Sequence, residues 1–209
     1  MSDLAAGPRH FSMIRTFHLA DLFTLANAGC GVGSLFAAMS YMAHPRLALF
    51  LAAAVLVPVA LVFDALDGRV ARWRHKHSPL GRELDSLADV ISFGVAPAAL
   101  AFAAGMRGGW DCVVLIYFVA CGVSRLARFN ITADTLSAGG DKVKYFEGTP
   151  IPSSVLLVAM LAAAAWGGRL DERLYWGGIE AGFTLHPLVL FFALSGSLMI
   201  SKTLRIPKL

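Results

Sequence analysis

Six long apolar segments, separated by short polar stretches, run through the sequence. They cover residues 22–43, 46–73, 82–104, 110–129, 151–166 and 187–201. A helix needs about 20 apolar residues to cross the hydrocarbon core of a bilayer. The pattern therefore predicts an all-α integral membrane protein, built as a bundle of six transmembrane helices. The last two segments are shorter, and we expect them to begin in the membrane interface.

The first 20 residues have a looser pattern. Phe11, Ile14 and Phe17 alternate with Arg9 and Arg15, which favours an amphipathic helix lying in the membrane interface, with a disordered tail as the alternative. We expect no removable signal peptide, because no compact apolar core with a small-residue cleavage site follows the basic residues. We predict one domain over residues 1–209, with the interfacial helix in 1–20 and the transmembrane bundle in 21–209.

The composition agrees with a membrane protein and gives its orientation. Hydrophobic residues make up 57% of the 209 residues and charged residues only 15%, outside the usual range of a soluble domain. The net charge of +4 does not require a nucleic acid partner, since the basic residues lie between the apolar segments. Fourteen of the 18 Lys and Arg residues fall on the side that would hold both termini, which predicts cytoplasmic termini. We expect a bacterial cytoplasmic (inner) membrane.

Four aspartates interrupt the apolar pattern where the second segment ends and the third begins. Asp64 and Asp67 are spaced i, i+3, and Asp85 and Asp89 are spaced i, i+4, so each pair shares one helix face. A turn containing Pro79 lets the two helices run antiparallel. Because a carboxylate in the bilayer costs about 2.5 to 3.5 kcal/mol on insertion scales, we expect partners for this cytoplasmic cluster.

Divalent cations are the partners that this cluster favours. All of its ligands are hard oxygens, which suit Mg²⁺, Mn²⁺ or Ca²⁺ better than zinc. Two divalent cations would balance four carboxylates and bind a diphosphate substrate. The alternative is an ion network of the aspartates with Arg69, Arg72, Arg74 and Arg82.

The string D-x2-D-G-x2-A-R-x8-G-x3-D-x3-D, from Asp64 to Asp89, resembles the signature of the CDP-alcohol phosphotransferase family. This resemblance implies that the protein is a membrane enzyme that transfers a phosphatidyl or similar group from a CDP-linked donor to an alcohol. It also implies six helices, a homodimer and a cytoplasmic site with two divalent cations, Mg²⁺ or Mn²⁺, with Ca²⁺ as a further candidate.

The same resemblance implies a role for each signature residue. Asp64, Asp67 and Asp85 would be metal ligands, and Asp89, the general base, is counted with the metal site. Nucleotide contacts would come from Asp64, Gly68, Ala71, Arg72, Gly81 and Asp85. Thr24 and Asn27 form an i, i+3 polar pair in the first segment. We count Asn27 with the nucleotide-binding residues, and contact of this pair with the second helix is the alternative.

Four further stretches, ELDSLADVISFGVAPA, RLARFN, YFEGTPIPSS and LMIS, resemble the phosphatidylserine synthase branch. The implied substrates are CDP-diacylglycerol and L-serine. Thr149 departs from this resemblance, which leads us to expect Leu or Met at its position. A serine acceptor needs a cation for its carboxylate and polar groups for its ammonium. The expected acceptor-binding residues are Ser92, Arg125, Arg128, Asn130 and Glu147.

Other functions remain open for this sequence. The two arginines of the fourth segment, Arg125 and Arg128, would in one alternative extend to lipid headgroups. The same chemistry with glycerol 3-phosphate, inositol phosphate or choline as the acceptor is a second alternative. A membrane cation transporter that uses the four aspartates as its translocation site is a third, from a different class.

Overall fold

The computed structural model describes residues 19–73, 79–137, 145–201 and 205–207. The interfacial helix expected within residues 1–20 lies almost wholly outside the described residues. The helices are α1 (Leu19–Ala43), α2 (Leu47–Trp73), α3 (Pro79–Asp89), the π-helix η2 (Val90–Val95), α4 (Ala96–Ala103), α5 (Gly109–Ser137), α6 (Val155–Trp166) and α7 (Leu190–Ile200), with short 3-10 turns η3 (Ile151–Ser154), η4 (Asp171–Arg173) and η5 (Pro187–Val189). Two antiparallel ribbons pair β1 (Tyr145–Glu147) with β4 (Arg205–Pro207) and β2 (Ile179–Ala181) with β3 (Phe183–Leu185).

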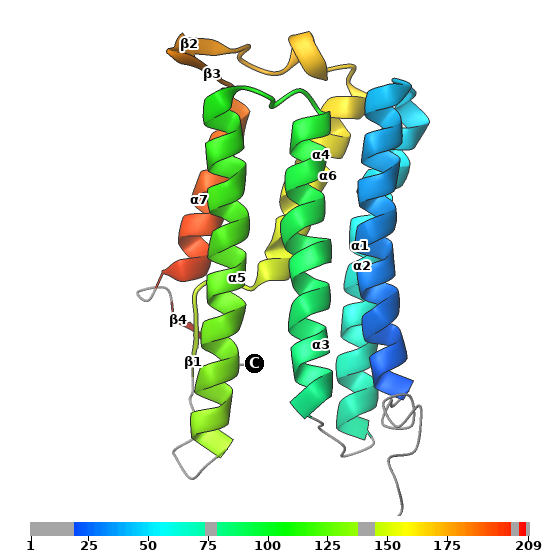
Figure 1. The fold of residues 1–209 in the computed structure, drawn as a ribbon, viewed down its shortest axis with the longest axis vertical. Coiled ribbons are helices and arrows are strands. Elements are labelled where there is room, and N and C mark those ends of the chain that lie inside the picture. Colours follow the sequence, from blue (N-terminus) through cyan, green and yellow to red (C-terminus); the bar gives the residue numbers. More distant parts are fainter. Residues whose placement is uncertain (1–18, 74–78, 138–144, 202–204, 208–209) are drawn as a thin grey trace, which may run out of the picture.

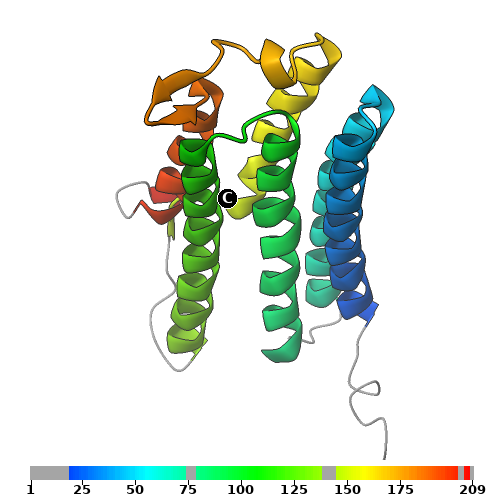
Figure 2. The same cartoon turned by 45° about the horizontal axis from the view of Figure 1, so that its top comes forward.

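The helices run roughly parallel to one axis (Figure 1). α1 packs along α2, and α5 packs along α7. The continuous helix formed by α3, η2 and α4 lies between these two pairs, as the turned view also shows (Figure 2). This central helix contacts α1 on one side and α5 on the other. Residues on α1, α3 and α5 can therefore meet around it.

Four helical stretches are long and apolar enough to cross a membrane. They are Ala20–Ala43, Leu47–Val70, Leu80–Ala103 and Gly109–Ile131, with mean hydropathies from 1.5 to 2.5. The shorter apolar helices Ile151–Trp166 and Pro187–Ile200 coincide with the fifth and sixth predicted segments. The helical nature of all six segments is thus confirmed, and the four long apolar helices are consistent with an integral membrane protein. By length and composition, four of the described helices qualify as spans.

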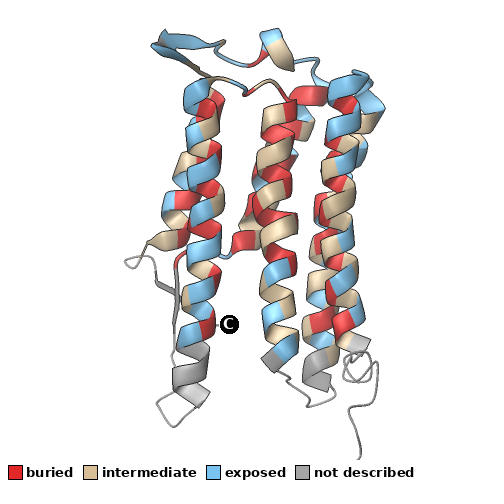
Figure 3. Cartoon of the chain, in the orientation of Figure 1, coloured by how far each residue is buried: buried red, intermediate tan, exposed pale blue. Residues whose placement is uncertain are grey.

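Burial follows the helix faces (Figure 3). The faces turned toward neighbouring helices are buried, and their large side chains include Phe50, Phe93 and Phe118. The outward faces carry exposed apolar side chains such as Phe36 and Ile116. In a soluble protein such surfaces would be unfavourable, whereas in lipid they need no cover. The exposed apolar faces therefore agree with a membrane location.

A polar link closes the end of the bundle opposite the aspartates. The buried carboxylate of Asp111, in the first turn of α5, accepts hydrogen bonds from the backbone N–H groups of Gly108 at 2.9 Å and His186 at 2.7 Å. The Nδ1 atom of His186 donates to the same carboxylate at 2.6 Å. These bonds fix the end of the β2–β3 ribbon to the start of α5.

Close contact between α1 and the π-helix depends on a glycine. A Cβ atom added at Gly31 would lie 2.6 Å from the Ser92 Oγ and 2.9 Å from the Ser92 Cα. The Ser92 hydroxyl itself donates to the backbone oxygen of Asn27 at 2.8 Å. Gly31 thus lets α1 approach the central helix at the level of Asn27, one turn away.

We expect Gly31→Ala to lower the stability of the protein in detergent by about 1 to 3 kcal/mol, because the added methyl group forces α1 away from η2. Gly29→Ala is the matched control, since nothing lies within 4 Å of a Cβ atom at Gly29. Thermal unfolding followed by circular dichroism measures both. Equal melting temperatures for the two variants would contradict the packing argument.

Candidate metal centre

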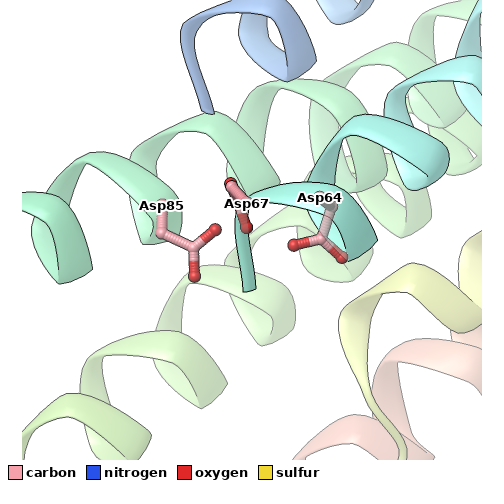
Figure 4. Close-up of side chains that lie close together, drawn as sticks. All are labelled: Asp64, Asp67 and Asp85. Atoms are coloured by element: carbon pink, nitrogen blue, oxygen red, sulfur yellow. The ribbon is translucent and has the colours of Figure 1, made fainter. Parts of the chain in front are cut away.

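Three of the four predicted aspartates come together in the structure. Asp64 and Asp67 project from α2 and Asp85 from α3, and the three carboxylates face one another (Figure 4). One oxygen atom from each lies within 4.8 Å of the others. The predicted convergence of the two helix ends is correct for these three residues.

The arrangement is suitable for a divalent cation. Metal–oxygen distances of about 2.1 to 2.4 Å place the ligand oxygens of one ion at most about 4.8 Å apart. The Oδ1 atom of Asp85 is buried and has no hydrogen-bond partner among the described residues. An acceptor atom in that position needs a donor or a cation, so the three carboxylates fit such an ion.

Asp89 lies apart from these three carboxylates. It is the last residue of α3, 7% exposed, and its Oδ1 atom accepts a hydrogen bond from the Asn27 Nδ2 atom at 3.2 Å. It interacts electrostatically with Asp64, Asp67 and Asp85. The fourth aspartate therefore adjoins the cluster without belonging to its most compact part, and it keeps a different hydrogen-bond partner.

The first helix supplies the hydrogen-bond donors for these acids. The Thr24 hydroxyl donates to the Oδ2 atom of Asp67 at 2.8 Å, in a buried position. Thr24 therefore contacts the second helix, as the alternative reading of the polar pair stated. Asn27, three residues later, contacts Asp89 on α3, a partner that the sequence had not identified.

The remaining nucleotide-site residues lie next to the cluster in sequence. Gly68 follows Asp67 on α2, and Gly81 precedes Asp85 by one turn on α3; both are half-buried. Ala71 and Arg72 belong to the last turn of α2, but their side chains lie outside the described residues. Their roles stay predictions.

The predicted acceptor-binding residues differ in their burial and in their partners. Arg125 has a buried Nε atom without a hydrogen-bond partner among the described residues, and it interacts electrostatically with Asp89. Ser92 is fully buried and is bonded to α1. Arg128 is half-buried on α5, while Glu147 lies in β1 with its side chain outside the described residues. Of these four residues, Arg125 has the clearest geometry for binding a ligand.

Asn130 joins helices α5 and α3. Its Nδ2 atom donates to the Ser86 Oγ at 3.1 Å and is 3.4 Å from each carboxylate oxygen of Glu83. Sequence reasoning missed Glu83 and Ser86 as its partners. Their i, i+3 spacing on α3 was a signal that this helix has a second polar face.

Thr149 lies two residues before the η3 turn and Ser154 is the last residue of that turn, and each has a buried hydroxyl oxygen without a hydrogen-bond partner among the described residues. The backbone N–H of Thr149 donates to the Leu198 oxygen at 3.2 Å. Thr149, which stands where Leu or Met is expected, is thus bonded through its backbone to the last turn of α7.

The sequence is similar to a known family of membrane enzymes. Residues 17–194 match the family model for CDP-alcohol phosphatidyltransferase, and the chain belongs to this family. It is 42% identical over 203 residues to the CDP-diacylglycerol--serine O-phosphatidyltransferase of Saccharomyces cerevisiae, which covers 95% of this chain and 74% of the relative.

Other similar proteins come from bacteria and archaea. The enzyme of the same name from Helicobacter pylori is 39% identical over 183 residues, or 87% of this chain and 68% of the relative. The archaetidylserine synthase of Methanothermobacter thermautotrophicus is 38% identical over 144 residues, or 68% of this chain and 56% of the relative. These relatives come from all three domains of life, so they do not identify the membrane in which this chain lies. The bacterial inner membrane stays a prediction.

We expect Thr24→Val to weaken Mn²⁺ binding by about 10- to 100-fold, because it removes the hydrogen bond that orients Asp67. Electron paramagnetic resonance of free Mn²⁺ in titrations of the purified protein measures the affinity. Thr24→Ser keeps the hydroxyl and should bind Mn²⁺ nearly as the unmodified protein does. Unchanged binding by Thr24→Val would show that Asp67 does not need this donor.

Proposed function

We propose that this chain is a CDP-diacylglycerol–serine O-phosphatidyltransferase, which makes phosphatidylserine and CMP from CDP-diacylglycerol and L-serine. The observation that carries the proposal is the compact carboxylate cluster of Asp64, Asp67 and Asp85 in a chain of this family. The choice of serine is supported by relatives of that name that cover 95% and 87% of the chain.

The three clustered aspartates would hold two divalent cations, Mg²⁺ or Mn²⁺, which would supply positive charge to neutralise the donor diphosphate and the departing CMP. Asp67 would be the ligand common to both ions, and Thr24 fixes the direction of its carboxylate. Gly68, Ala71 and Gly81 leave room for the cytidine beside the helix backbones. Arg72 supports a phosphate or the acidic cluster.

Asp89 acts as the general base in this mechanism. As the serine hydroxyl oxygen forms its bond to the phosphorus atom of the phosphatidyl group, its proton passes to Asp89. The bond between that phosphorus atom and the CMP oxygen breaks, and CMP leaves with the bonding electron pair. The Asn27 amide orients Asp89 by donating to one of its oxygens, so that the other oxygen can receive the proton.

The expected result with purified protein, CDP-diacylglycerol, Mn²⁺ and labelled L-serine is labelled phosphatidylserine together with CMP. Asp89→Asn should lower kcat by about 10²- to 10⁴-fold, because the amide cannot accept the proton. Because Asp89 lies outside the compact cluster, this variant should still bind Mn²⁺. Chromatography of the lipid product and Mn²⁺ titration measure the two properties.

The same assay separates the alternatives. Lipid formed with glycerol 3-phosphate, inositol phosphate or choline in place of L-serine would keep the chemistry and change the acceptor. Cation uptake into proteoliposomes, with no acceptor converted, would favour the transporter. Neither alternative has a supporting observation comparable with the relatives that share the serine-transferase name.

The proposal includes six membrane spans, a homodimer and a cytoplasmic active site. In Figure 1 the short helices α6 and α7 run beside the four longer ones, which supports six passes. The excess of basic residues on the side of the aspartates supports the cytoplasmic orientation.

We expect a cysteine placed at the exposed residue Glu180, in β2, to react with a membrane-impermeant maleimide in intact cells. A cysteine at the exposed residue Leu80, in the first turn of α3 at the opposite end of the bundle (Figure 1), should react only after the cells are opened. Both changes are made in a chain whose Cys30, Cys112 and Cys121 are replaced by Ala. The reverse labelling pattern would invert the proposed orientation.

A further inference from the structure

Asn27 has an unused acceptor next to the proposed base. The residue is 0% exposed, and its Nδ2 atom donates to Asp89 at 3.2 Å. Since an ionised carboxylate only accepts hydrogen bonds, the amide must turn its NH₂ group toward Asp89. Its carbonyl atom Oδ1 then points away from that bond, and it is buried with no partner among the described residues.

Arg125, on the helix across α3 from α1, has an unused donor. Its Nε atom is buried without a hydrogen-bond partner among the described residues, and its charge interacts with Asp89. Asn27 belongs to α1 and Arg125 to α5, while Asp89 belongs to α3 between them (Figure 1). The helix that carries the proposed base thus lies between one helix with an unpartnered acceptor and another with an unpartnered donor.

Buried polar atoms are nearly always hydrogen-bonded in folded proteins. Two unpartnered atoms of opposite type, on residues that both interact with the group that must deprotonate the acceptor, indicate a ligand that carries a donor and an acceptor of its own. An α-amino acid with a side-chain hydroxyl has an ammonium, a carboxylate and the reacting oxygen within about 4 Å of one another.

We infer that Asn27 is a specificity-determining residue of the acceptor site, whose Oδ1 atom accepts a hydrogen bond from the ammonium group of the amino acid while Arg125 binds its carboxylate. This inference rests on the proposed function and changes the predicted nucleotide-binding role of Asn27. The serine hydroxyl then faces Asp89, and a single residue, Asn27, positions both the base and the acceptor.

Ser92 keeps Asn27 in place. Its hydroxyl donates to the Asn27 backbone oxygen at 2.8 Å, and the close approach at Gly31 brings the two helices together at this level. The predicted acceptor residue Ser92 therefore acts through Asn27 as a positioning residue.

The test compares acceptors that each lack one charged group. L-serine, 3-hydroxypropanoate, which lacks the ammonium, and ethanolamine, which lacks the carboxylate, are assayed with CDP-diacylglycerol and Mn²⁺. In the unmodified protein kcat/KM should be at least about tenfold higher for L-serine than for either analogue, because an unfilled polar contact is costly. Asn27→Ala should remove most of the discrimination against 3-hydroxypropanoate and leave that against ethanolamine unchanged.

Arg125→Met should give the mirror result, with the preference over ethanolamine lost and the preference over 3-hydroxypropanoate kept. Poorer support of Asp89 in Asn27→Ala lowers the rates with every acceptor by one factor, so the ratio between acceptors isolates the ammonium contact. If Asn27→Ala does not fold, Asn27→Ser, which keeps a smaller polar group, is measured in the same way. Ser34→Ala is the control for loss of a polar group in α1, because Ser34 bonds to the Ala53 oxygen instead; its ratios should not change.

An unchanged serine to 3-hydroxypropanoate ratio in the Asn27 variants would overturn the inference, as would a higher KM for CDP-diacylglycerol with the acceptor ratios intact. Either result leaves the proposed function standing, since L-serine is still converted. Failure of the unmodified protein to convert L-serine would instead overturn the proposed function, and this inference with it.

Discussion

Repulsion between carboxylates in apolar surroundings is the constraint on which this structure depends. Asp64, Asp67 and Asp85 place oxygen atoms within 4.8 Å of one another, and like charges at such distances are costly where water is scarce. The positions of these residues on α2 and α3 hold the carboxylates there. Bound cations relieve the repulsion between the carboxylates, and an anionic diphosphate balances the remaining positive charge. The repulsion energy therefore favours the binding of both.

Two hydrogen bonds to these acids come from α1, a helix with a largely apolar sequence. Thr24 and Asn27, one turn apart on α1, donate to acids on two different helices. Small residues make this possible, because Gly31 lets α1 approach the central helix closely. Packing of this kind is typical of membrane helices, where close backbone approach and buried hydrogen bonds replace the hydrophobic effect as the source of association. The same contacts that assemble the bundle therefore orient the reactive groups.

Much of this arrangement could be predicted from sequence, because it depends on periodicity within single helices. The apolar segments predicted where the helices lie, and the i, i+3 and i, i+4 spacings predicted which aspartates share a helix face. Contacts between helices could not be derived in the same way: a spacing shows that Thr24 and Asn27 share a face, but not which helix that face meets. Asn130 with Glu83, and Asp111 with His186, are pairs separated by 47 and 75 residues. The π-helical segment could not be predicted from the sequence either, because it is defined by backbone hydrogen bonds and not by residue type.

That segment, Val90–Val95, begins directly after Asp89, and at its end the Ala96 N–H donates to the Ile91 oxygen, five residues back. A π turn contains one residue more than an α turn. If this segment became α-helical with all of its residues kept, the additional residue would rotate Asp85 and Asp89 by roughly 100° relative to α4. The additional residue and the wider turn therefore compensate each other, and a change in one without the other would turn these carboxylates away from the other acids.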